Sequence, residues 1–185
     1  RAMLAMCAVL QPHLLRLNEF LINAHRDAGT KSYADDGYIC APASVAYEAL
    51  RIFAEGALDD GCVITYEKCE EFCKAHVDGR VNLTEIQGRN PNIKIGEING
   101  SYGIMCQGIP IGQDEFVEKK LNRIITGIQG DLKKINHTLG FFHYEMTMIL
   151  NKSISKRANH FLRYCLPEHT LEFARKVDEI IMSYL

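Results

Sequence analysis

Residues 30–40 read TKSYADDGYIC and carry two adjacent carboxylates, Asp35 and Asp36. Thr30–Tyr33 has the composition of a short strand, and a second short apolar run follows at Tyr38–Cys40. A tight hairpin would place both Asp side chains in solvent at its tip. Two carboxylates held together repel each other unless a cation lies between them, and Mg²⁺ or Mn²⁺ prefers such oxygen ligands. Asp-Asp-Gly is also an ordinary turn sequence, so these residues alone leave a metal site and a simple turn open.

The composition is that of an ordinary soluble globular protein. The chain has 185 residues, of which 47% are hydrophobic and 24% charged, with a formal net charge of −2. No overall basic field indicates a nucleic-acid partner, although a groove can be locally basic on a neutral protein. The seven cysteines lack the paired spacing of a zinc site. We therefore expect reduced thiols and an intracellular protein, cytoplasmic or nuclear.

The first residues do not have the pattern of a targeting or membrane segment. The apolar run Ala2–Leu10 is too short for a membrane span and wrongly flanked for a secretory signal, so we expect no membrane partner. The chain begins with Arg1 rather than Met. We expect an upstream part of the same polyprotein to be missing.

Helical periodicity dominates the first sixty residues. Apolar residues recur at three- and four-residue steps over Ala2–Ala24, with a kink or break expected at Pro12. A second helix is expected to begin with Ser44 as its N-cap. Gly56 and then Asp59-Asp60-Gly61 are expected to end it. This second pair of carboxylates indicates only turn chemistry.

Short extended segments are expected between the second helix and residue 112. They are Cys62–Tyr66, Lys68–Cys73, Ile93–Ile98 and Ser101–Gln107. Asn99-Gly100 is a strong two-residue hairpin turn, and residues 74–92 are polar and irregular. Gly108–Gly112 reads as a tight apolar loop.

The remainder of the chain is expected to be helical. One helix begins at Asp114 and continues to about Ile135, a second runs from about Phe142 towards Leu162, and a third spans Leu171–Tyr184. The fold class is therefore α+β. We expect one region at residues 1–112 and an all-helical region at residues 113–185.

The order of the motifs resembles the palm of a reverse transcriptase of the retrotransposon type that lacks long terminal repeats. The resemblance rests on Tyr33-Ala34-Asp35-Asp36, a helix, Gly61–Glu70 (GCVITYEKCE) and Gly108–Gly112 (GIPIG). The tail, Ser155–Arg163, is similar to the helical region after that palm. The resemblance implies a partial palm over residues 1–112, made of the carboxylate hairpin, a helix and short antiparallel strands. A helical region similar to a thumb or linker would then cover residues 113–185.

The same resemblance implies two-metal nucleotidyl transfer from a dNTP to a primer 3′-hydroxyl, on an RNA or DNA template. Asp35 is the expected metal ligand, and Asp36 would contribute less directly. Lys68 would lie near the triphosphate as a proton donor, although a solvated strand lysine is an equally simple interpretation. Mg²⁺ or Mn²⁺ is expected to bind only with a further Asp from an upstream strand.

Contacts to the template-primer are implied at a second set of residues. They are Tyr33 and Ala34, bordering the primer end; Gly108 and Gly112, allowing close approach of the backbone; and Lys156, Arg157 and Arg163, holding phosphates. Lys152 and His160 complete this local basic cluster at helical spacing. Core packing, a structural turn and a solvated helix face are the respective alternatives.

Two other functions remain open at the level of sequence. Without the upstream Asp, we expect the 185 residues alone to have no polymerase activity. A remnant of a retroelement that acts only as a nucleic-acid-binding or structural module is the main alternative. A palm-type nucleotide cyclase shares a carboxylate hairpin, but the Gly108–Gly112 motif and the trailing basic helices argue against it.

Overall fold

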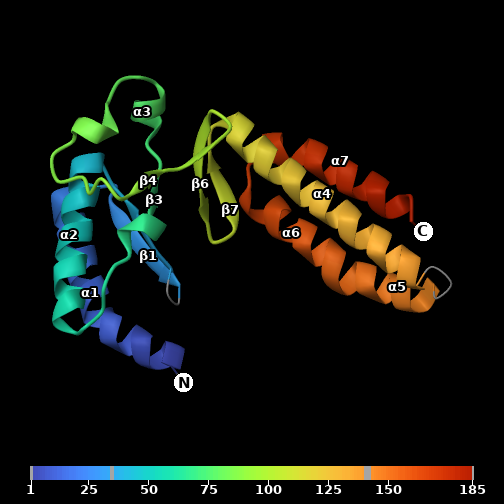
Figure 1. Cartoon of the computed structure of the whole chain (residues 1–185), viewed down its shortest axis with the longest axis horizontal. Coiled ribbons are helices and arrows are strands. Elements are labelled where there is room, and N and C mark those ends of the chain that lie inside the picture. Colours follow the sequence, from blue (N-terminus) through green and yellow to red (C-terminus); the bar gives the residue numbers. More distant parts are fainter. Residues whose placement is uncertain (1, 34–35, 140–142, 185) are drawn as a thin grey trace. The chain divides into compact units, whose positions relative to one another are not determined.

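The computed structural model describes the backbone of residues 2–33, 36–139 and 143–184, and the side chains of residues 9–32, 36–138 and 144–184. The fold is α+β, as predicted, with helices and small sheets of both antiparallel and parallel pairing. The chain forms two compact units, Arg1–Gly96 and Glu97–Leu185 (Figure 1). Each unit has its own packing and is described by itself.

Two helices and a hairpin form the centre of the first unit. The helices are α1 (Ala2–Ala24) and α2 (Ala43–Asp59), and the hairpin strands are β1 (Gly29–Tyr33) and β2 (Asp36–Cys40). Their shared core contains the buried residues Leu17, Leu21 and Ala49, with Leu14, Phe20, Ala28, Ile39, Ala41, Val45 and Phe53 packed against them. The apolar faces that the sequence indicated on the two helices therefore meet each other and one side of the hairpin.

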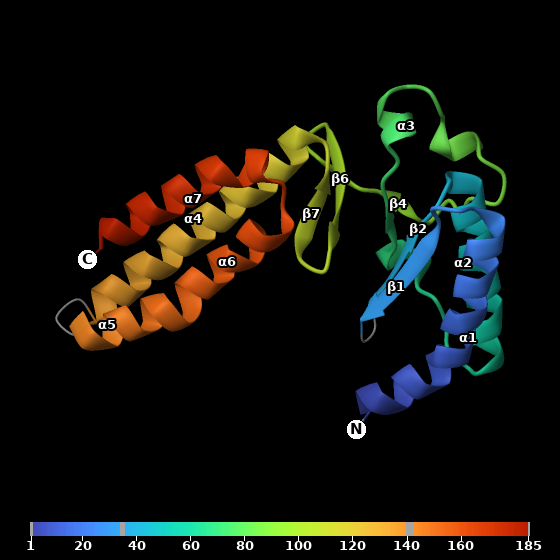
Figure 2. The ribbon, with the colours of Figure 1, turned by 180° about the vertical axis from the view of Figure 1, so that it is seen from behind.

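Two details of these helices differ from the sequence prediction, and one agrees with it. Pro12 lies inside α1, which continues as one helix, and the N-terminal part of α1 bends away from the rest in Figure 2, in agreement with the expected kink rather than a break. Pro42, not Ser44, is the N-cap of α2, and no side chain caps that end. Gly56 does not end α2. It is buried, and a Cβ there would lie 2.5 Å from Nδ1 of His13, so this glycine allows α1 and α2 to approach closely.

The rest of the first unit is mostly irregular chain. Its short elements are the 3₁₀ turn η1 (Tyr66–Lys68), β3 (Glu70–Glu71), α3 (Lys74–Val77), the 3₁₀ turn η2 (Leu83–Glu85) and β4 (Lys94–Ile95). The pairing of β3 with β4 is parallel, which the sequence did not indicate. Cys62–Tyr66 forms no strand, and only Glu70–Glu71 of the expected second segment does. The irregular excursion over residues 74–92 is as predicted.

The expected strand Ile93–Ile98 is divided between the two units. Its first part, β4, pairs with β3, whereas β5 (Glu97–Ile98) pairs with β6 (Ser101–Cys106) in the second unit. The Asn99-Gly100 turn between β5 and β6 is as predicted, with φ of 48° and 80°. The sheet continues from β6 to β7 (Ile109–Gly112).

Helices form the body of the second unit. They are α4 (Asp114–Leu139), α5 (His143–Ile149), the π-helical segment η3 (Leu150–Ile154), α6 (Ser155–Tyr164) and α7 (Pro167–Met182). Their core contains Val117, Leu121, Ile125, Ile128, Leu132, Met146, Leu150, Ile154, Ala158, Phe161, Phe173 and Val177. The three helical regions predicted from periodicity are confirmed, and Gly127 and Gly130 do not interrupt α4. The compact units divide at Gly96, ahead of the division near residue 112 that we expected, because the β5–β7 sheet packs on α4.

Candidate functional site

The β1–β2 hairpin confirms the turn predicted around the two carboxylates. The strands are antiparallel, and Tyr33 pairs with Asp36. Only Ala34 and Asp35 separate this pair in the sequence. Both of those residues lie outside the described residues, as does the side chain of Tyr33, so the expected roles of Ala34, Asp35 and Tyr33 stay predictions.

Asp36 is the described carboxylate at this end of the hairpin. It is exposed, begins β2, and has no ion pair or side-chain hydrogen bond with the described residues. Within the described ranges, no three His, Cys, Asp or Glu side chains lie close enough to hold a metal ion, and Asp35 lies outside those ranges. Asp36 alone therefore offers an unused carboxylate, and a metal there requires further oxygen ligands.

The base of the hairpin is fixed by packing and by one side-chain bond. Ile39 and Ala41 contact the core between α1 and α2. The Thr30 hydroxyl donates to the carbonyl oxygen of Tyr38 across the strands at 2.9 Å. The hairpin is thus held at one end by the core, while Asp36 and Gly37 are exposed at the other.

Lys68 does not lie on a strand, contrary to the sequence prediction. It is the last residue of η1 and is exposed. Its N–H donates to the carbonyl oxygen of Thr65 at 3.0 Å, and the N–H of Cys69 donates to that of Tyr66 at 3.0 Å. The β-branched residues before Lys68 favour a strand, but these local hydrogen bonds form a 3₁₀ turn instead. Lys68, the proposed proton donor, therefore lies on a turn.

The Gly108–Gly112 segment is a strand and a turn rather than the expected loop. Gln107 and Gly108 have φ of 51° and 79°, and β7 then pairs with β6. Gly112 is opposite Gly103, and a Cβ on Gly112 would lie 2.4 Å from the carbonyl oxygen of Tyr102. The protein's own backbone therefore requires glycine at 112. Gly108 is exposed, and a Cβ there would lie 3.6 Å from Nε2 of His160.

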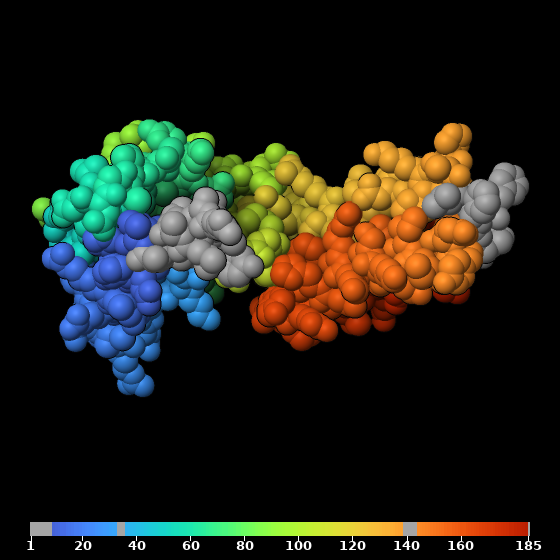
Figure 3. All heavy atoms as spheres, turned by 90° about the horizontal axis from the view of Figure 1, so that it is seen from below, coloured from blue at the N-terminus to red at the C-terminus, as the bar shows by residue number. Residues whose placement is uncertain are grey.

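The basic cluster is placed on η3 and α6, at helical spacing as expected. Lys152, Lys156 and Arg163 are exposed, and α6 turns its Ala158 and Phe161 into the core. No Asp or Glu occurs from residue 146 to residue 167. Figure 3 shows the orange and red-orange surface of this segment along one side of the second unit. The exposed side of α6 is therefore locally basic, although the whole chain is not.

Two members of the cluster also have structural partners. Arg157 Nη1 donates to Asp131 Oδ2 at 2.9 Å, and both side chains are half exposed. His160 Nε2 lies 3.3 Å from the carbonyl oxygen of Gln107, so α6 contacts the β6–β7 turn. His160 also stacks edge-on against Tyr164, with ring centroids 5.3 Å apart. The structure thus brings Gly108 next to the basic face of α6.

Sequence reasoning missed a partly buried polar network in the first unit. Glu71 accepts from the Tyr47 hydroxyl at 2.7 Å and from Arg89 Nε at 2.7 Å. Arg89 Nη2 donates to the carbonyl oxygen of Ile93 at 2.7 Å. Burial, and then the hydrogen bond to Glu71, raise the pKa of the Tyr47 phenol. The partners are far apart in the sequence, and no spacing rule connects them.

A second polar contact links the two long helices. His13 Nε2 lies 2.6 Å from Asp60 Oδ2, and Asp60 is the C-cap residue of α2. This contact and its surroundings leave the His13 side chain largely enclosed by the fold. Asp59-Asp60-Gly61 does end the helix, with Gly61 at a φ of 76°.

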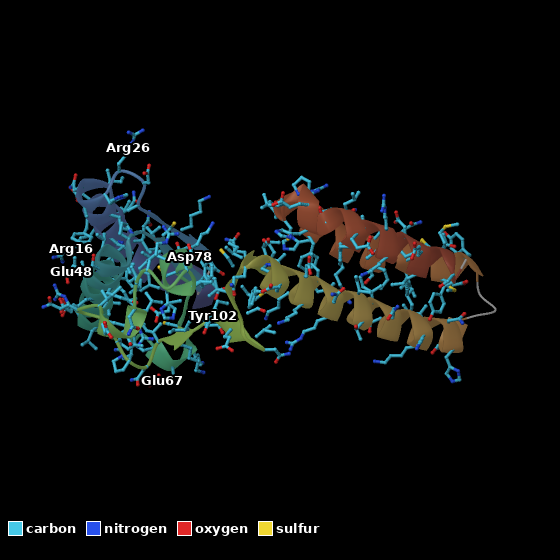
Figure 4. All side chains as sticks on the ribbon, turned by 90° about the horizontal axis from the view of Figure 1, so that it is seen from above. Arg16, Arg26, Glu48, Glu67, Asp78 and Tyr102 are labelled. Atoms are coloured by element: carbon cyan, nitrogen blue, oxygen red, sulfur yellow. The ribbon has the colours of Figure 1, made fainter. Side chains whose placement is uncertain are left out.

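The outer side of the two helices carries solvated charges. Figure 4 shows Arg16 of α1 and Glu48 of α2 pointing away from the unit. Arg51 donates to Glu48 and Glu55 on the same helix. Hydrogen bonding from Arg51 lowers the pKa of the Glu48 carboxyl. The charges of Glu48, Arg51 and Glu55 form ion pairs within one helix at a solvated surface.

The comparisons with known proteins leave the chain without an assigned family. No family model matches it, and no curated protein and no solved structure matches it significantly. Within the described residues, no helix is both long enough and apolar enough to cross a membrane.

Proposed function

We propose that the chain is part of an RNA-directed DNA polymerase of the retrotransposon type, in which it supplies the second half of the palm and the helical region that follows. The observation that carries this proposal is the hairpin register. Pairing of Tyr33 with Asp36 leaves Ala34 and Asp35 to join the strands, which agrees with a carboxylate pair at a hairpin tip.

The chemistry assigned to this hairpin is metal-assisted nucleotidyl transfer. Asp35 is the principal ligand of Mg²⁺ or Mn²⁺, and Asp36 assists it. A carboxylate from another polypeptide segment completes the site, so the 185 residues alone hold the metal weakly. When bound, the metal activates the primer hydroxyl and stabilises the triphosphate. Lys68, exposed on η1, donates a proton to the leaving pyrophosphate.

The template-primer is assigned to the second unit. Lys156 and Arg163 are exposed on a helix that carries no Asp or Glu of its own, which favours contacts to phosphates. Arg157 contributes less because Asp131 already balances its charge. Gly108 lies beside His160 and leaves room for a nucleic-acid backbone, whereas Gly112 is needed by the protein's own sheet.

Salt-dependent binding of an RNA–DNA hybrid tests the nucleic-acid part of the proposal. We expect fluorescence anisotropy of a labelled poly(rA)–oligo(dT) duplex to report binding that weakens steeply with salt. The double variant Lys156→Gln/Arg163→Gln should reduce the salt slope by about 2, one for each lost phosphate contact. Lys133→Gln/Lys134→Gln is the matched control, since both lysines are exposed on α4 and the charge change is equal.

The outcomes separate the proposal from its alternatives. An equal reduction in both double variants would mean that only net charge matters. No binding at any salt concentration would contradict the proposal and favour a purely structural remnant. Primer extension by the 185 residues with Mg²⁺ or Mn²⁺ should be absent, and robust extension would contradict the need for an outside carboxylate.

A remnant that binds nucleic acid without metal chemistry is the second candidate. The observation in its favour is that the basic face of α6 is intact and lies on a well-packed helix, independently of the hairpin. It predicts hybrid binding that is unchanged by Asp35→Asn and by Mn²⁺.

A further inference from the structure

The first unit has a hollow that neither the hairpin nor the basic helix uses. Its volume is about 310 Å³, at the lower end of the range for small-molecule sites. Residues of α2, of η1 and of the segment 88–93 form its walls, so three stretches distant in sequence converge there.

Arg89 is the polar group around which this hollow is built. Its side chain is 10% exposed, and Glu71 and the carbonyl oxygen of Ile93 occupy Nε and Nη2. The third nitrogen, Nη1, has no hydrogen-bond partner among the described residues. No buried side-chain nitrogen or oxygen in the described part of the chain lacks a partner. Nη1 therefore keeps accessible surface, and Arg89 lines the hollow.

The charges around the hollow favour a neutral ligand. Glu71 balances the charge of Arg89 and uses one oxygen for Arg89 and the other for Tyr47. Arg51, also in the wall, is balanced by carboxylates on its own helix. The hollow therefore offers a hydrogen-bond donor, Arg89 Nη1, but no positive charge that lacks a neighbouring carboxylate. A carbonyl oxygen matches such a site better than a phosphate, whose charge would find no counter-charge.

The remaining walls favour a flat, apolar body. Tyr47, Tyr66, Leu50 and Ile93 line the hollow, and aromatic and aliphatic side chains bind planar rings. Gly88, with a φ of 85°, brings the backbone past Tyr47, and the nearest atom to a Cβ there would be Cβ of Tyr47 at 3.9 Å.

We propose that this hollow binds a small, uncharged, planar molecule with a ring carbonyl, such as a keto nucleobase, and that Arg89 Nη1 donates to the carbonyl oxygen. None of the residues that line this hollow belongs to the carboxylate hairpin or to α6. The ligand proposal therefore does not depend on the proposed polymerase function.

Two nucleosides test the proposal on the full 185-residue chain. Inosine carries the ring carbonyl, and purine riboside has the same ribose and bicyclic ring but lacks that oxygen and the adjacent N1–H. In ¹H–¹⁵N NMR titrations, inosine should shift the amide signals of Gly88, Arg89 and Asn90. Purine riboside should bind at least about tenfold more weakly, because the hydrogen bond to a charged donor is lost. Equal affinities would overturn the role of the carbonyl.

A third probe and a matched pair of variants complete the test. Inosine 5′-monophosphate should bind no more tightly than inosine, and a clear gain from the phosphate would overturn the assignment of an uncharged ligand. Arg89→Lys keeps a charge beside Glu71 but removes the forked donor, so inosine affinity should fall about tenfold. Arg80→Lys, on an exposed arginine outside the hollow, should leave it unchanged.

Unfolding of Arg89→Lys would not leave the proposal untested. Tyr66→Leu removes one aromatic side chain from the wall of the hollow and should weaken the binding of both nucleosides to the same extent. Unchanged affinity in Tyr66→Leu, or inosine-induced shifts confined to residues outside the hollow, would contradict the site.

Discussion

The tripeptide Asp-Asp-Gly occurs twice in the first unit, and the two copies have different structures. In Asp35-Asp36-Gly37 the second Asp begins a strand, is exposed, and has no side-chain partner among the described residues. In Asp59-Asp60-Gly61 the first Asp ends a helix, and the second is bound to His13 at 2.6 Å. Gly61 there has a φ of 76°, whereas Gly37 has no such constraint.

The difference shows that a carboxylate pair gains its role from its surroundings. The fold accounts for the second copy without a metal. Gly61 adopts the left-handed conformation that ends the helix, and Asp60 binds His13. The first copy leaves Asp36 unused by any described residue. The unused Asp36 carboxylate on a hairpin anchored to the core is the described feature that supports the proposed metal site.

The largest expected effect on stability concerns Glu71, whose two carboxylate oxygens both accept hydrogen bonds. Glu71→Gln leaves the largely enclosed Arg89, whose side chain is 10% exposed, without its counter-charge and should lower the free energy of unfolding by about 2 kcal/mol. Denaturant titration followed by circular dichroism measures it. Asp78→Asn, which removes the partner of the exposed Arg80, should cost less than about 1 kcal/mol. Similar losses of unfolding free energy in both variants would contradict a larger contribution from the Glu71–Arg89 pair than from the exposed Asp78–Arg80 pair.

The two glycines should differ in their tolerance of a side chain. Gly61→Ala forces a left-handed backbone on an L-residue and should cost about 1–2 kcal/mol. Gly37 lies in β2, and no atom of the described residues outside its chain neighbours lies within 4 Å of an added Cβ, so Gly37→Ala should leave stability unchanged or slightly raised. The same denaturation measurement compares them. A larger loss of unfolding free energy for Gly37→Ala than for Gly61→Ala would contradict the conclusion that the backbone requires glycine at 61 and not at 37.

The smallest stability effects concern the second Asp of each pair. Asp60→Asn removes an ion pair in which His13 is largely buried and Asp60 is half exposed, so we expect a loss of about 1 kcal/mol. Asp36→Asn should change the unfolding free energy by less than about 0.5 kcal/mol. His13→Gln should remove the sensitivity to Asp60→Asn in a double-mutant cycle, and additive losses would contradict a direct contact.

Periodicity and turn chemistry predicted much of this fold. The apolar steps of α1 and α4, the Asn99-Gly100 turn and the hairpin around Asp36 all follow from local patterns that the packing supports. The predictions failed where tertiary contacts decide. Gly56 resembles a helix terminator but makes room for His13, and Ile93–Ile98 resembles one strand but contributes to two sheets.

The candidate site was predictable only in its local part. The Asp35-Asp36 pair and the basic spacing on α6 are visible in the sequence because neighbouring residues form them. The network of Tyr47, Glu71 and Arg89 is not, since residues 24 and 18 positions apart meet only after folding. The sequence predicts an extended segment from Lys68 to Cys73, yet in the structure hydrogen bonds within the η1 turn hold Lys68.

Paramagnetic broadening by Mn²⁺ tests the central claim most directly, because both Asp-Asp-Gly copies are observed in the same sample. We predict that Mn²⁺ broadens the amide signals of Asp36 and Gly37 at concentrations that leave those of Asp59–Gly61 sharp. Asp35→Asn should abolish this preference, and Asp59→Asn, at an exposed position of the other copy, should not. Equal broadening at both copies, or a preference for Asp59–Gly61, would contradict a metal-binding hairpin.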